Sequence, residues 1–60
     1  MKFKFIGESD KYFKKGNIYE LVTMQIEGNY VYSIFVDEDN ELINIPYRYI
    51  ENFNRNWSKM

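Results

Sequence analysis

The chain has 60 residues, a net charge of −1 and neither cysteine nor histidine. These counts exclude disulfides and thiolate metal sites, and they remove the commonest general base and the commonest transition-metal ligand. Aromatic residues make up 20% of the chain, so a few large rings must form most of a small core. We therefore expect one domain over residues 1–60, with no catalytic centre, no cofactor and no bound metal.

The charge balance and the apolar runs indicate where the protein works. Eight basic and nine acidic residues do not suggest generic binding to phosphate backbones. No apolar run approaches the length of a membrane span. Lys2 and Lys4 are followed by no apolar stretch of the signal-peptide kind. We expect a cytoplasmic protein.

The periodicity along the first half is that of β-strands. Residues 2–6 alternate lysine with phenylalanine, which predicts a half-buried strand with its lysines in water. The polar residues 7–15 predict a loop. The longest predicted strand covers residues 18–27 and is apolar in both phases, so we expect it to bend midway, as long strands of small barrels do.

Two turn signals separate the next strands. Gly28-Asn29 fits a type II′ hairpin, and the β-branched and aromatic run that follows predicts a strand over residues 30–36. The polar residues 37–40 predict a second turn, and residues 41–45 a short strand. Pro46 lacks an N–H group and is predicted to interrupt the ladder.

The last quarter of the chain has two interpretations. The first is a 3-10 turn over residues 47–50, a short last strand over 51–54 and a flexible tail over 54–60 that carries Trp57. The second is a three-stranded sheet followed by a helix from Pro46 to Trp57, against which the asparagines and aromatic residues argue mildly. We favour the first, an all-β fold: a small five-stranded barrel with a 3-10 turn before the last strand.

Three segments resemble Src-homology (SH3) domains. Residues 12–22, Tyr-Phe-Lys-Lys-Gly-Asn-Ile-Tyr-Glu-Leu-Val, resemble the segment that leads into that family's second strand. Residues 27–31 fall where the family has a turn and paired tryptophans, and residues 44–50 resemble its Ile-Pro-x-x-Tyr-Val stretch. The chain is also similar to single-domain SH3-like proteins of Firmicutes and their phages, many without an assigned function. The resemblance implies an SH3-like barrel.

The resemblance covers the family's ligand groove less well than its fold. In that family, proline-rich helices dock on aromatic residues, and only Tyr30, Pro46 and Tyr49 match that groove here. The family's first aromatic segment and long acidic loop are cut to residues 7–11. The first of the paired tryptophans is replaced by Tyr30.

The leading candidate site is a surface of aromatic residues. Tyrosine has an apolar ring and a polar hydroxyl group, and it is enriched in binding hot spots. Tyr30 and Tyr32 share a face of their strand, so both point outward if Val31 is in the core. The alternative is that these rings belong to the core or are singly exposed without a role. The predicted protein-binding residues are Tyr30, Tyr32, Pro46, Tyr47 and Tyr49, with Trp57 as a further candidate.

Two charged groups offer other sites. Lys2, Lys4, Lys14 and Lys15 are interleaved with aromatic residues and could bind single-stranded nucleic acid by charge and stacking, or simply solvate a strand and a loop. The acidic residues 37–41 could offer oxygen ligands to Ca²⁺, but they lack the spacing of a calcium loop, so we expect a solvated turn.

Together these features predict a non-catalytic protein-interaction module. If the chain is encoded by a phage, we expect an effector that blocks a host protein by occupying its surface. Two alternatives stay open: a nucleic-acid-binding barrel that uses the lysines, and a homo-oligomer in which an edge strand such as residues 2–6 pairs with itself.

Overall fold

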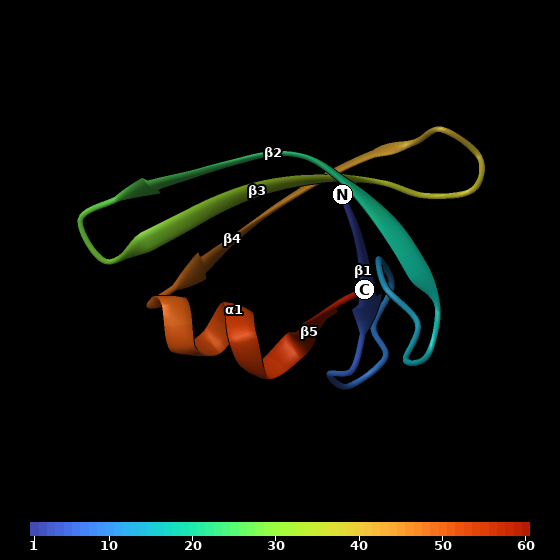
Figure 1. Ribbon diagram of the computed structural model, residues 1–60, viewed down its shortest axis with the longest axis horizontal. Coiled ribbons are helices and arrows are strands. Elements are labelled where there is room, and N and C mark those ends of the chain that lie inside the picture. The colour runs from blue at the N-terminus through green and yellow to red at the C-terminus, as the bar shows by residue number, and fades with distance from the viewer.

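The computed structural model describes every residue from Met1 to Met60 and contains five strands and one helix (Figure 1). The five strands form one antiparallel sheet in the order β4-β3-β2-β1-β5. Of the predicted all-β, five-stranded barrel, the coarser part is confirmed: the chain is mostly β and its five strands form one open sheet, but one of its elements is a helix. The elements are β1 (Lys2–Phe5), β2 (Ile18–Glu27), β3 (Tyr30–Val36), β4 (Leu42–Arg48), α1 (Ile50–Asn56) and β5 (Trp57–Lys59).

The long strand β2 bends as predicted. Its pairing with β3 slips by one residue between Leu21 and Thr23, so Val22 is an extra residue in β2. Such a bulge bends a strand and increases its twist. Figure 1 shows the result, since β2 runs beside β3 across the top of the molecule and then curves down to β1.

A tight turn joins β2 to β3. Gly28 has a φ of 59° and Asn29 has no positive φ, which are the signs that a type II′ turn requires. Glycine reaches positive φ without steric cost, so the predicted hairpin is formed where the sequence placed it.

The core is built from aromatic rings, with Trp57 at its centre. The indole stacks on Phe35 at 3.9 Å between centroids and meets the edge of Phe13 at 4.8 Å and of Phe5 at 4.9 Å. Edge and offset contacts of this kind add to the stabilisation that burial gives. The buried residues are Phe3, Phe5, Phe13, Tyr19, Val31, Ser33, Phe35, Ile43, Phe53 and Trp57.

The favoured prediction for the C-terminal quarter is wrong, and the alternative of a helix in this segment is closer, since α1 covers Ile50–Asn56. Residues 47 and 48 belong to β4 rather than to a 3-10 turn, and residues 51–54 are helical rather than extended. Residues 54–60 are not a loose tail, because they complete α1 and form β5, which pairs with β1. Trp57, which was expected on that tail, is buried.

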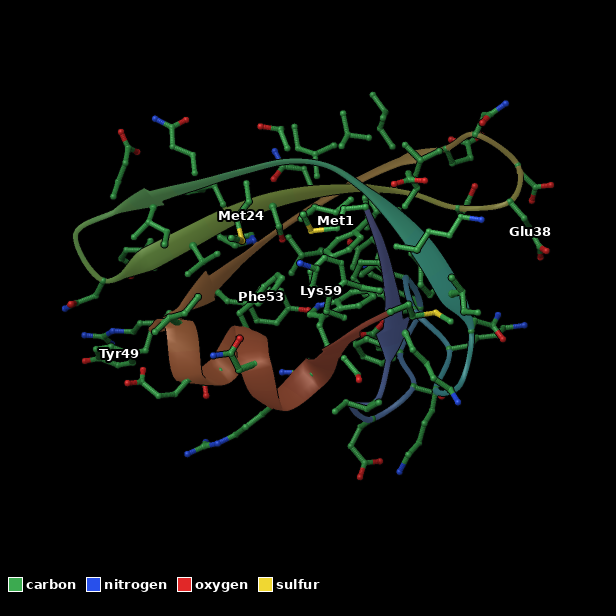
Figure 2. All side chains as sticks on the ribbon, in the orientation of Figure 1. Met1, Met24, Glu38, Tyr49, Phe53 and Lys59 are labelled. Atoms are coloured by element: carbon green, nitrogen blue, oxygen red, sulfur yellow. The ribbon has the colours of Figure 1, made fainter.

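Burial explains why this segment is helical. Phe53 and Trp57 are four residues apart, and the helix brings both rings to the inner side of the sheet, where their centroids are 6.4 Å apart. Figure 2 shows Phe53 between α1 and the sheet. Burying two large rings outweighs the weak helix propensity of the three asparagines in α1.

Pro46 does not end β4, contrary to the prediction. It pairs with Tyr32 inside the strand. Because β4 is an edge of the sheet, it has a neighbour on one side only, and an edge strand tolerates a residue without an N–H group.

β1 is not an edge strand. It pairs with β2 on one side and with β5 on the other, so residues 2–6 are not the free edge named in the alternative of edge-strand self-association. The two edges of the sheet are β4 and β5. The one helix, α1, is too short to cross a membrane.

Candidate protein-binding face

Tyr30 and Tyr32 lie on the outer face, which we define as the side of β2, β3 and β4 that is turned away from the aromatic core. Val31 and Ser33, the residues that alternate with them, are completely buried on the inner side. Tyr30 is 44% exposed and Tyr32 is 39% exposed. Their rings stack on each other at 6.1 Å with an angle of 28° between the planes. The two tyrosines therefore point outward, as expected if Val31 is in the core.

The strand register brings Pro46 to the same place. Pro46 lies opposite Tyr32, and Arg48 lies opposite Tyr30, so all four side chains share one face of the sheet. On the other flank of β3, Gln25 pairs with Tyr32. The outer face comprises Glu20, Thr23, Gln25 and Glu27 on β2, Tyr30, Tyr32, Ile34 and Val36 on β3, and Leu42, Asn44, Pro46 and Arg48 on β4.

Three apolar residues of this face were missed by the sequence analysis. Ile34 and Val36 are half-buried beside the tyrosines, and Leu42 is the most exposed large apolar residue of the chain at 69%. A signal was present, because Tyr30, Tyr32, Ile34 and Val36 follow one another at the two-residue period of a strand face. The outer face is therefore apolar along the whole length of β3.

Two opposite charges flank the tyrosine pair. Glu27 on β2 and Arg48 on β4 both pair with Tyr30, one on each side. Neither forms an ion pair within the chain, whose one salt bridge joins the N-terminal amine of Met1 to Glu20. The Arg48 guanidinium instead lies over the ring of Tyr49, 5.4 Å from its centroid. Both charges are thus free to pair with groups outside the chain.

Tyr47 does not belong to the outer face. Its hydroxyl oxygen accepts a 3.0 Å hydrogen bond from Nε1 of Trp57, and its ring meets the ring of Phe53 edge-on at 5.7 Å. Burial raises the pKa of the Tyr47 hydroxyl above its ordinary value of 10.0, an effect that the Trp57 hydrogen bond partly offsets and that the negative charge of Asp10 adds to. Tyr47 stabilises the core and cannot contact a partner beside Tyr32.

Tyr49 lies beyond the end of β4, next to Arg48, and is not one of the residues that the strand register places on the outer face. It follows β4 with a φ of 71°, and its N–H group donates to the carbonyl of Asn29. It lines a small hollow of about 290 Å³ with Ile26, Val31 and Ile50. The structure therefore brings together three of the five predicted binding residues, which are Tyr30, Tyr32 and Pro46.

The predicted lysine site does not form one basic surface. Lys2 and Lys4 lie on the exposed side of β1, while Lys14 and Lys15 lie in the loop before β2. Lys14 lines an open hollow of about 620 Å³. Four acidic residues line the same hollow: Asp10 from the loop before β2, and Asp37, Glu38 and Asp39 from the turn between β3 and β4. Mixed charge of this kind differs from the continuous positive groove that tracks a phosphate backbone.

The acidic turn uses its first carboxylate to hold its own shape. Oδ1 of Asp37 accepts hydrogen bonds from the N–H groups of Asp39 and Glu41, each at 2.9 Å. Asn40 has a φ of 61°, which asparagine tolerates better than most residues. No group of three or more residues of the metal-binding types is placed to hold an ion.

The candidate site is thus a sheet face rather than a cleft. It has an apolar middle column on β3, a proline and a leucine on β4, and one charge of each sign at the end near the β2–β3 turn. Comparison of the chain with family models, with curated proteins and with solved structures finds no match.

Proposed function

We propose that this protein is a non-catalytic interaction module that binds another protein chain through its outer face. The observation that carries the proposal is the stacked, exposed pair of Tyr30 and Tyr32 beside Pro46. Tyrosine loses little conformational entropy on binding and offers both an apolar ring and a hydrogen-bonding group. A contiguous exposed apolar patch is typical of protein interaction sites.

The rest of the fold supports this proposal. The molecule buries most of its other rings around Trp57, so the exposed tyrosines are not a consequence of a missing core. The composition lacks histidine and cysteine, the usual catalytic bases and nucleophiles.

We also propose that the fold is an SH3-like barrel. Its five strands, its bent β2 and the tight turn between β2 and β3 support this proposal. The helix α1 takes the place of the short turn that the resemblance implies before the last strand.

The test is affinity capture from a lysate of the organism that encodes the chain. The bait is the tagged protein, compared with the double variant Tyr30→Ala/Tyr32→Ala at low salt and at about 0.5 M salt, where screening weakens exposed charge contacts. We expect a protein that stays bound at high salt on the wild type and is lost from the double variant. Tyr12→Ala is the matched control, because Tyr12 is equally exposed but lies in the loop before β2.

Two results would contradict the proposal. One is equal capture by the wild type and the double variant. The other is nucleic acid in the eluate that is released as the salt concentration rises, which is the signature of phosphate contacts made by Lys2, Lys4, Lys14 or Lys15.

A further inference from the structure

We infer that the outer face binds a second copy of this chain, in a face-to-face dimer whose two-fold axis runs along β3. The inference rests on the proposed function, because it names the partner of that same face. Two features carry it: the apolar middle column and the placement of Glu27 and Arg48.

The apolar column suits a sheet-on-sheet contact. Tyr30, Tyr32, Ile34 and Val36 run down the centre of the face, and more polar strands flank them. Two sheets that pack face to face lie about 10 Å apart, and the side chains between them interdigitate. Interfaces have the same arrangement of an apolar centre and a polar rim.

The two charges are placed so that the face is complementary to itself. Glu27 and Arg48 stand on opposite sides of Tyr30 in one row across the sheet. A two-fold rotation about an axis along β3 exchanges the β2 side of one copy with the β4 side of the other. Each Glu27 then lies opposite the partner's Arg48, and the same contact is made twice, as in every isologous interface.

The other two-fold arrangement is disfavoured by the same charges. An axis across the strands would bring opposite ends of β2 together, with Glu27 facing the partner's Glu20. Arg48 would then face the partner's Leu42 at the far end of β4. The Met1 amine already compensates the charge of Glu20, so the main cost of this arrangement is that Arg48 meets an apolar side chain instead of an opposite charge. An axis along β3 also leaves one charge on an apolar side chain, because each Glu20 then lies opposite the partner's Leu42. The axis along β3 is favoured because it places Glu27 and Arg48, the two charges without a partner in the chain, opposite each other.

The surface that such a dimer would bury can be compared with the whole surface of the chain. An interface of ordinary size removes about 800 Å² from each partner. That is about a fifth of the 4419 Å² that this chain exposes. The outer face spans three strands of ten, seven and seven residues, and we expect a dissociation constant in the micromolar range for the dimer.

The test is sedimentation velocity of the untagged full chain over protein concentrations from about 1 μM to about 1 mM, which bracket that affinity. We expect the wild type to pass from monomer to dimer. Glu27→Arg alone and Arg48→Glu alone should each weaken association at least about tenfold, because each variant brings like charges together.

The decisive sample is an equimolar mixture of these two variants. In the mixture each substituted side chain meets the opposite charge, so dimers should re-form at wild-type concentrations. Glu8→Arg and Lys15→Glu are the charge-matched controls, because both side chains are exposed in the loop before β2 and away from the outer face. Both controls should associate like the wild type.

Three results would overturn the inference. They are a wild type that stays monomeric throughout, a dimer that neither single variant weakens, and a mixture that associates no better than its components. None of them removes the proposed function, since a monomer that captures a protein through Tyr30 and Tyr32 is still an interaction module with a different partner.

Discussion

The two faces of β3 both carry aromatic side chains, but those on one face are buried and those on the other are exposed. On the inner face, Phe35 stacks on Trp57 and is almost completely buried. On the outer face, Tyr30 and Tyr32 stack only on each other and are exposed. The difference comes from the end of the chain, because α1 and β5 fold back over the inner face and leave the outer face uncovered (Figure 1).

The alternating pattern of a strand therefore does not decide which of its two faces becomes part of the core. Alternation divides β3 into two faces, and apart from Ser33 the side chains on both faces are aromatic or aliphatic. The face that is buried is the one that a distant segment covers. An uncovered apolar face is then the part of the molecule most suited to a partner.

Loss of the Trp57 ring, which lies at the centre of the segment that covers the inner face, should have the strongest effect. Trp57→Ala deletes the ring that stacks on Phe35 and meets Phe13, Phe5 and Phe53, so we expect a loss of about 3–5 kcal/mol in the free energy of unfolding. A domain of this size has little more stability than that to lose. Urea unfolding and near-UV circular dichroism measure the effect.

Trp57→Phe is the matched control. It keeps a ring in the core and should lose clearly less stability than Trp57→Ala. If Trp57→Ala stayed within about 1 kcal/mol of the wild type, Trp57 would not hold the inner face covered, and the comparison between the two faces would fail.

The first three strands could be predicted from the sequence because their signals are local. Alternating lysine and phenylalanine, a glycine–asparagine turn and a β-branched run each act over a few residues. The bounds of β2 and β3 match their predictions, and β1 ends one residue early. The C-terminal quarter could not be predicted in this way, because contacts with β1, β3 and β4 hold it in place. The available hint was the spacing of Ile50, Phe53 and Trp57, which is that of a helix face.

The binding face was predicted only in part, for a related reason. Pro46 and Tyr47 are neighbours in an extended strand, so their side chains must point to opposite faces. A predicted turn over residues 47–50 removed that alternation and grouped Tyr47 with the outer tyrosines. Once β4 is known to continue to Arg48, the same rule places Pro46 outside and Tyr47 inside.

An intermediate effect is expected at the rim of the inner face. Tyr47→Phe removes the oxygen that accepts the hydrogen bond of Trp57 Nε1 and leaves that donor unpaired, so we expect a loss of about 1–2 kcal/mol near neutral pH. Urea unfolding at neutral pH measures it. A variant as stable as the wild type would contradict a structural role for this hydrogen bond.

Tyr47 should also shape the alkaline limb of the stability curve. Burial raises the pKa of its hydroxyl above 10.0 in the folded state, so above that pH the unfolded chain releases this proton more readily than the folded chain. Stability from this group is therefore complete below pH 10.0 and decreases as the pH rises through the folded pKa. Urea unfolding at several alkaline pH values should show a shallower decline for Tyr47→Phe. Equal slopes in the two proteins would contradict the assignment.

The smallest effect on folding is expected on the outer face. Tyr32→Thr removes an exposed ring and keeps a good strand former, so at concentrations where the chain is monomeric its unfolding free energy should stay within about 0.5 kcal/mol of the wild type. At higher concentrations the wild type should gain stability by mass action as it forms dimers, and Tyr32→Thr should not. Thermal unfolding across a concentration series measures both. If Tyr32→Thr were strongly destabilised in dilute solution, the outer face would be part of the core. A difference in stability between wild type and variant that appears only at high protein concentration is the result expected of an exposed face that binds a second copy.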